Sequence, residues 1–190
     1  MPLNIPNLLT YFRILLIPVF VGVFYLSNDT ITLSHKHQFA TLIFAIAAIT
    51  DWFDGYLARY LNQTSAFGAF LDPVADKLMV SAALILLAQL GYVDALIAFI
   101  IIGREITISA LREWMAQLGN SKSVAVSMLG KIKTTFQMLA ILLLLYHDPI
   151  FSLPTHQVGT LFVYLAALLT LWSMVYYLML ALPMMKKNAK

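Results

Sequence analysis

The chain of 190 residues contains no cysteine. Disulfide bonds, thiolate nucleophiles and cysteine-bound zinc are therefore excluded. Charged residues are also scarce, at 11%, whereas hydrophobic residues make up 61% of the chain. Soluble domains usually contain about 25% charged and about 45–50% apolar residues. The two departures together predict an integral membrane protein that crosses the bilayer several times.

Six apolar stretches are long enough for membrane-spanning helices, which need roughly 20 to 25 residues each. They cover residues 8–26, 37–60, 66–90, 93–118, 124–146 and 156–185. Strands of a membrane barrel need only about 10 residues of alternating polarity, so these runs do not suit a barrel. The N-terminus lacks the basic segment of a cleavable signal peptide, so we expect the first run to be retained. We predict one all-α, polytopic transmembrane domain over residues 1–190.

The basic residues are distributed unevenly over the two ends of these helices. Of the twelve Lys and Arg residues, only Lys36 belongs to the end opposite the chain termini. Because basic residues concentrate on the cytoplasmic side of membrane proteins, both termini are expected in the cytoplasm. All four histidines fall at the opposite end, so histidine is an unsuitable base or ligand for a cytoplasmic site.

Acidic residues are rare, but four of the nine lie within one short window, namely Asp51, Asp54, Asp72 and Asp76. The first two are three residues apart and the last two are four apart, so each pair shares a helix face. A short loop joins the two helices, so we expect antiparallel neighbours whose carboxylates converge near the cytoplasmic side. Carboxylates in a membrane are costly unless paired or metal-bound, and Mg²⁺ prefers oxygen ligands. The pattern predicts a site for one or two divalent cations.

Small and basic residues accompany the aspartates. Gly55 and Gly68 allow a close approach of backbone and ligand, and Ala58 keeps the helix face small. Arg59 offers a planar cation suited to phosphate. A structural cluster of carboxylates paired with Arg59 and Lys77, or an ion path, is the alternative to a site for metal and phosphate.

The complete spacing over residues 51–76 is Asp-x2-Asp-Gly-x2-Ala-Arg-x8-Gly-x3-Asp-x3-Asp. It resembles the signature of the CDP-alcohol phosphatidyltransferases at every fixed position. Members of that family are membrane enzymes with six spans, often homodimers, with a cavity that faces the cytoplasm. They transfer a phosphatidyl group, or a related substituted phosphate, from a CDP-linked donor to an alcohol and release CMP. The resemblance implies the same fold and the same reaction for this chain.

The resemblance also implies roles for single residues. The ligands of the metal, expected as two Mg²⁺ or Mn²⁺ ions, would be Asp51, Asp54, Asp72 and Asp76. Asp76 would also be the catalytic base that deprotonates the acceptor hydroxyl. The contacts to CDP-diacylglycerol would be Asn7, Thr10, Gly55, Ala58, Arg59 and Ser65. For the first two of these contacts, helix capping is the alternative.

Charged residues of the fourth and fifth helices are candidates for binding an acceptor that carries its own phosphate. They are Arg104, Arg112, Lys131 and Lys133. Snorkelling to the membrane surface, or mutual pairing, is the alternative for such residues.

The segments around these residues, such as 103–106, 109–113 and 130–134, resemble family members that use sn-glycerol 3-phosphate as acceptor and CDP-diacylglycerol as donor. We expect these two substrates, a location in the bacterial cytoplasmic (inner) membrane, a homodimer and no nucleic-acid partner. Inositol phosphate, serine or phosphatidylglycerol as acceptor is the first alternative. A cation transporter or channel is the second.

Overall fold

A computed structural model describes residues 5–61, 66–117, 128–150 and 153–188 of the chain. Within these ranges the regular secondary structure is helical, and no strand forms. The helices are α1 (Ile5–Tyr25), α2 (Leu33–Tyr60), α3 (Ala66–Gln89), α4 (Ala95–Gln117), α5 (Met128–Tyr146) and α6 (Thr155–Asn188). The predicted all-α chain with six long helices is confirmed, and each helix lies within a few residues of its expected position.

Local capping explains where two of the helices begin. The second helix starts at Leu33, earlier than predicted, because Thr32 precedes it and accepts a hydrogen bond from the amide of His35 at 3.5 Å. The fourth helix follows Asp94, whose carboxylate accepts the amide of Leu96 at 2.7 Å. Side chains that cap a helix in this way set its first turn without tertiary contacts.

A glycine turn ends α3 and directs the chain into α4. Gly91 has a φ of 75°, in the left-handed region that favours glycine. Its amide donates to the carbonyl of Ala88 at 3.1 Å, and the amide of Tyr92 donates to that of Leu87 at 2.9 Å. This pair of bonds satisfies carbonyls at the helix end and closes a tight turn between α3 and α4.

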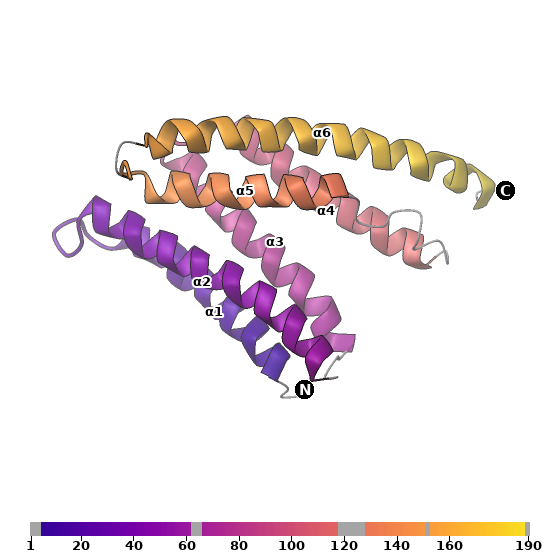
Figure 1. Ribbon diagram of the computed structural model, residues 1–190, viewed down its shortest axis with the longest axis horizontal. Coiled ribbons are helices and arrows are strands. Elements are labelled where there is room, and N and C mark those ends of the chain that lie inside the picture. Colours follow the sequence, from indigo (N-terminus) through magenta and orange to yellow (C-terminus); the bar gives the residue numbers. More distant parts are fainter. Residues whose placement is uncertain (1–4, 62–65, 118–127, 151–152, 189–190) are drawn as a thin grey trace.

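The contacts between the six helices close into a ring. Figure 1 shows the helices from one side, with α5 and α6 along one edge and α1 and α2 along the other. α1 packs against both α2 and α3; α3 contacts α4, α4 contacts α6, α6 packs along α5, and α5 returns to α2. The two aspartate-bearing helices, α2 and α3, contact each other at few positions, because α1 lies against both. The expected contact between α2 and α3 is therefore present but small, and most of the connection between them runs through α1.

The hydrophobic core occupies one end of the ring. It includes a buried residue from every helix: Phe20, Phe44, Leu84, Ile101, Ile141 and Val163. These residues come from the later halves of α1, α3 and α5 and from the earlier halves of α2, α4 and α6. The aspartates lie in the other halves of α2 and α3, so tight apolar packing at one end leaves the opposite end to polar groups.

The outer surface of the ring is apolar. Large side chains such as Leu15, Trp52, Phe99 and Trp172 are exposed, which suits lipid better than water. Two of the described helices contain runs long and apolar enough to cross a membrane, Asn7–Tyr25 in α1 and Thr155–Met179 in α6. In α2, α3, α4 and α5, charged residues of the site interrupt the apolar runs. That all six helices cross the bilayer stays a prediction.

Candidate functional site

One face of α1 carries three buried polar side chains. Asn7, Thr10 and Arg13 are 2%, 1% and 1% exposed. Because they are spaced by three residues, they lie on one side of the helix. Asn7 and Thr10 follow the first residue of α1, Ile5, so they belong to the body of the helix and not to a cap.

This face of α1 holds one carboxylate from each aspartate pair. Arg13 Nη1 donates to Asp51 Oδ1 of α2 at 2.5 Å. Thr10 Oγ1 donates to Asp72 Oδ1 of α3. Hydrogen bonds to a charged acceptor are stronger than neutral ones, so both carboxylates have a defined orientation. Asp51 remains 43% exposed while Arg13 is 1% exposed, so lone pairs of this carboxylate stay accessible.

A cavity of about 440 Å³ lies beside Asp51, a size typical of ligand sites. It is lined by α2 (Ala48, Asp51), α3 (Asp76, Lys77, Val80), α4 (Glu105) and α5 (Thr134, Thr135, Gln137, Met138, Leu139). The predicted base Asp76 and the predicted ligand Asp51 therefore share one cavity. Helices that are far apart along the chain meet there, which brings the aspartates of α2 and α3 close to the charged residues of α4 and α5.

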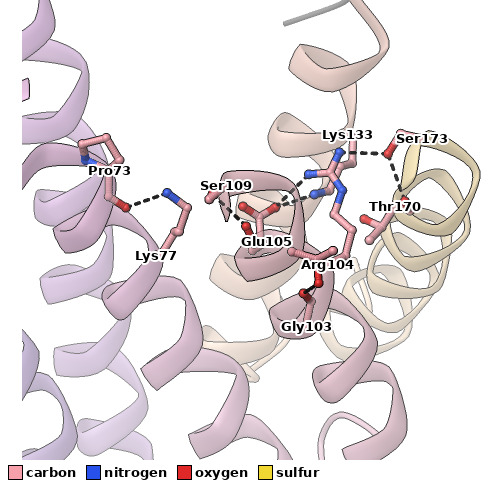
Figure 2. A network of polar contacts seen from close by, with 10 residues as sticks. Pro73, Lys77, Gly103, Arg104, Glu105, Ser109, Lys133, Thr170 and Ser173 are labelled. Atoms are coloured by element: carbon pink, nitrogen blue, oxygen red, sulfur yellow. Dashed lines mark hydrogen bonds and ion pairs between the residues drawn. The ribbon is translucent and has the colours of Figure 1, made fainter. Parts of the chain in front are cut away.

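Glu105 of α4 forms ion pairs with two of the predicted acceptor-binding residues (Figure 2). Lys133 Nζ donates to Glu105 Oε1 at 2.5 Å, and Arg104 Nη1 lies 3.5 Å from the same oxygen. Lys133 is 1% exposed and Arg104 is 7% exposed, and a charge so deeply buried needs a counterion. Glu105 is thus the shared counterion of both cations, and it holds Lys133 against the cavity wall.

The two arginines of α4 also connect it to α6. Arg104 Nη2 donates to Ser173 Oγ at 2.9 Å. The guanidinium carbon of Arg112 lies 5.8 Å from the ring centre of Tyr177, close enough for a cation–π contact. Neither arginine lines the cavity that contains Asp76. Their predicted role in binding the acceptor phosphate stays a prediction, and the structure gives both of them a contact with α6.

A second cavity, of about 600 Å³, lies between α3 and α4. Arg112 lines it together with Lys77 and apolar residues such as Phe70 and Ile106. Lys77 lines both cavities, and its Nζ donates to the carbonyl of Pro73 at 3.0 Å (Figure 2). Of the described basic residues, Lys77 alone lines the cavity of Asp51 and Asp76. It therefore joins the candidates for contact with a phosphate.

Several predicted site residues fall outside what the structure describes. Ser65 lies in an undescribed segment, and five further residues are described only as parts of their helices: Asp54, Gly55, Ala58, Arg59 and Lys131. Their predicted roles stay predictions. Among the side chains that are described, no three acidic or histidine groups gather into a metal-binding set. The predicted set of ligands includes Asp54, so the described residues contain only part of it.

Sequence reasoning assigned no role in the site to three residues that the structure places there. Arg13 and Glu105 are charges within apolar runs, a signal that marks functional candidates in membrane proteins. Gln137 is 3% exposed, lines the cavity, and has a buried amide oxygen without a hydrogen-bond partner. A single glutamine in an apolar helix gives no motif, so only its place in the fold reveals it.

The arrangement of carboxylates, cations and one shared cavity agrees with the comparison to known families. The family model for CDP-alcohol phosphatidyltransferase matches residues 3–172. This chain belongs to the CDP-alcohol phosphatidyltransferase family. The resemblance of residues 51–76 to the family signature is thereby confirmed. Family membership and the two long apolar helices together indicate a membrane protein.

Curated members of this family are similar to the chain over nearly its whole length. Proteins named CDP-diacylglycerol–glycerol-3-phosphate 3-phosphatidyltransferase from Escherichia coli (strain K12), Salmonella typhimurium (strain LT2) and Shigella flexneri serotype 5b are each 52% identical to it. Each alignment covers 180 residues, which is 94% of this chain and 94% of the relative.

Proposed function

We propose that this chain transfers the phosphatidyl group of CDP-diacylglycerol to sn-glycerol 3-phosphate, giving phosphatidylglycerophosphate and CMP. Its family and the names of its 52% identical relatives support the reaction and both substrates. The structural observation that carries the proposal is the shared cavity, where Asp51 and Asp76 face Glu105 and α5. A donor held by the aspartates and an acceptor held by the basic groups of α4 and α5 would meet there.

The reaction is a single displacement at phosphorus. The primary hydroxyl of glycerol 3-phosphate attacks the phosphorus that carries diacylglycerol, and the bond from that phosphorus to the oxygen of CMP breaks. Asp76 accepts the proton of the attacking hydroxyl. The protein's contribution is to hold the two substrates so that attacking and leaving oxygens lie in line.

A divalent cation fits the chemistry of the donor set. Asp51 and Asp72 are oxygen donors of the kind Mg²⁺ prefers, and each is oriented by a buried neighbour on α1. We propose that Asp51, Asp54, Asp72 and Asp76 hold Mg²⁺ or Mn²⁺, as two ions. When bound, the ions would neutralise the diphosphate of the donor. The donor itself would be contacted by the remaining signature residues and by the polar face of α1.

The acceptor phosphate needs cations close to Asp76. Lys133 is held by Glu105 at the cavity wall, and Lys77 lines the cavity directly. We propose that these two lysines contribute most of the attraction for the phosphate. Lys131, whose side chain is undescribed, and the two arginines of α4 would add to the positive potential.

We further propose a homodimer that crosses the bacterial cytoplasmic (inner) membrane six times, with the site and both termini in the cytoplasm. The eleven-to-one distribution of basic residues supports this orientation. Because the chain has no cysteine, single cysteines report sidedness without background. In intact cells a membrane-impermeant thiol reagent should label Asp29→Cys and spare Ala189→Cys; the reverse pattern would overturn the orientation.

The proposed activity is tested by release of CMP from CDP-diacylglycerol, with purified protein in detergent, Mg²⁺ present, and glycerol 3-phosphate added or withheld. Release should require the acceptor, and serine should not replace it. Asp76→Asn should abolish turnover, because the amide cannot accept the proton. Asp94→Asn is the matched control, since Asp94 caps α4 at the opposite end and asparagine caps equally well. Ion flux into liposomes without CMP release would identify a transporter instead.

A further inference from the structure

Gln137 lines the cavity with a buried amide oxygen that has no hydrogen-bond partner among the described residues. Its side chain is 3% exposed, it lines the cavity of Asp51 and Asp76, and its Oε1 atom is buried without a hydrogen bond. Buried amide oxygens are nearly always hydrogen-bonded, because an unsatisfied one loses its interaction with water and gains nothing in return. A ligand group in the cavity would supply the missing donor.

On α5, Gln137 lies between the lysine proposed to attract the phosphate and the hydrophobic core. Lys133 lies four residues earlier, on the same side of the helix and about 6 Å away along its axis. Ala140 and Ile141, in the following turn, belong to the hydrophobic core. Gln137 therefore lies where the polar cavity meets the apolar core, one turn deeper than the lysine proposed to attract the phosphate.

We infer that Gln137 accepts a hydrogen bond from the secondary hydroxyl of glycerol 3-phosphate and thereby selects this acceptor. The inference rests on the proposed function. In glycerol 3-phosphate the secondary hydroxyl lies between the phosphate and the primary hydroxyl. With the phosphate at the lysines and the primary hydroxyl at Asp76, the secondary hydroxyl is left as the donor for Gln137 Oε1.

Selectivity follows from the cost of leaving the amide unpaired. A site built to bind a substrate hydroxyl rejects an analogue without it, because the buried polar group of the protein then has no partner. An acceptor such as 3-hydroxypropyl phosphate has the same phosphate and primary hydroxyl and lacks only the secondary hydroxyl. With 3-hydroxypropyl phosphate, the proposed hydrogen bond to Gln137 is lost through a change in the substrate, while the protein is unchanged.

The first experiment compares these two acceptors on the wild-type protein by CMP release. We expect kcat/KM to be about 10-fold to 100-fold lower for 3-hydroxypropyl phosphate. Equal values for the two acceptors would overturn the inference and leave the proposed function intact. Absence of CMP release with either acceptor would overturn the proposed function itself, and the inference with it. This comparison needs no variant and so does not depend on the folding of one.

The second experiment removes the contact from the protein side. Gln137→Met keeps an unbranched side chain of similar length and deletes the amide. We expect kcat/KM for glycerol 3-phosphate to fall by the same 10-fold to 100-fold, while the value for 3-hydroxypropyl phosphate stays close to that of the wild type. The preference between the two acceptors should then nearly disappear.

A purely structural role would produce a different result, because both acceptors would lose activity by the same factor and the preference would persist. That outcome would overturn the inference, as would a Gln137→Met protein with wild-type values for both acceptors. Gln157→Met is the matched control, since Gln157 is exposed at the opposite end of the bundle. It should retain the wild-type preference.

Discussion

Replacement of Arg13 by methionine tests whether α1 organises the metal site. Arg13 is 1% exposed and donates to Asp51 Oδ1 at 2.5 Å. Methionine fills most of the vacated volume without a charge, so the helix packing should survive. The expected loss is functional: Asp51 would no longer be fixed in the orientation that the site requires.

The magnitude follows from the burial of the two partners. Breaking a fully buried ion pair costs about 3–5 kcal/mol. Asp51 is 43% exposed, so water can solvate the carboxylate after Arg13 is removed. The loss of interaction free energy on removal of Arg13 should therefore approach the lower value for a charged hydrogen bond, about 1.5 kcal/mol. This corresponds to about tenfold in an equilibrium constant. Groups that orient metal ligands typically affect metal affinity by about 10-fold to 100-fold.

The assay is CMP release as a function of Mg²⁺ concentration. Arg13→Met should need at least tenfold more Mg²⁺ for half-maximal activity, and Arg13→Lys, which keeps the charge and loses the planar fork, should lie between it and the wild type. Lys36→Met is the control, because it removes a buried cation that binds the carbonyl of Leu26 at the other end of the bundle. An Arg13→Met protein with an unchanged or lower Mg²⁺ requirement would refute the reasoning.

Three further predictions concern α1, the α5–α6 contact and the end of the bundle opposite the aspartates. Thr10→Val removes the hydroxyl that donates to Asp72 and should raise the Mg²⁺ requirement about tenfold. Thr50→Val should not, because the hydroxyl of Thr50 donates to carbonyls of its own helix, at Ile46 and Ala47. Gly159→Ala places a methyl group 2.8 Å from a side-chain carbon of Leu144 and should cost about 1–3 kcal/mol of stability. The control Gly22→Ala meets nothing within 4 Å and should be neutral or stabilising. Equal melting temperatures of the two variants would contradict the close packing of α5 and α6. Burial lowers the pKa of His147, the neighbouring His156 lowers it further, and Asp148 offsets part of this shift. Because the unfolded chain then binds more protons than the folded one, stability should fall as the pH drops through about 6.5, and His147→Asn should flatten this part of the melting profile.

Much of the fold could be predicted because its signals are local. Long apolar runs indicate the helices to within a few residues. Capping by Thr32 and Asp94 and the turn at Gly91 set the ends, and the cap at Thr32 was not read from the sequence, because α2 begins earlier than predicted. The aspartate pairs could be placed on helix faces from their spacing alone. The partners of the helices could not be predicted in this way: adjacency along the chain suggested that α2 packs on α3, whereas α1 lies against both.

The helices and the aspartate motif could be read from the chain alone, because composition, periodicity and motif spacing are properties of neighbouring residues. The reaction class followed from the resemblance of that motif to the family signature. Which side chains meet depends on how the helices pack. Arg13 reaches Asp51, Lys133 reaches Glu105, and Gln137 enters the cavity of Asp76 only because the ring brings separate helices together. These contacts cannot be read from the chain, because a buried charge or amide must find its partner in space and one sequence pattern is compatible with several packings that would supply different partners.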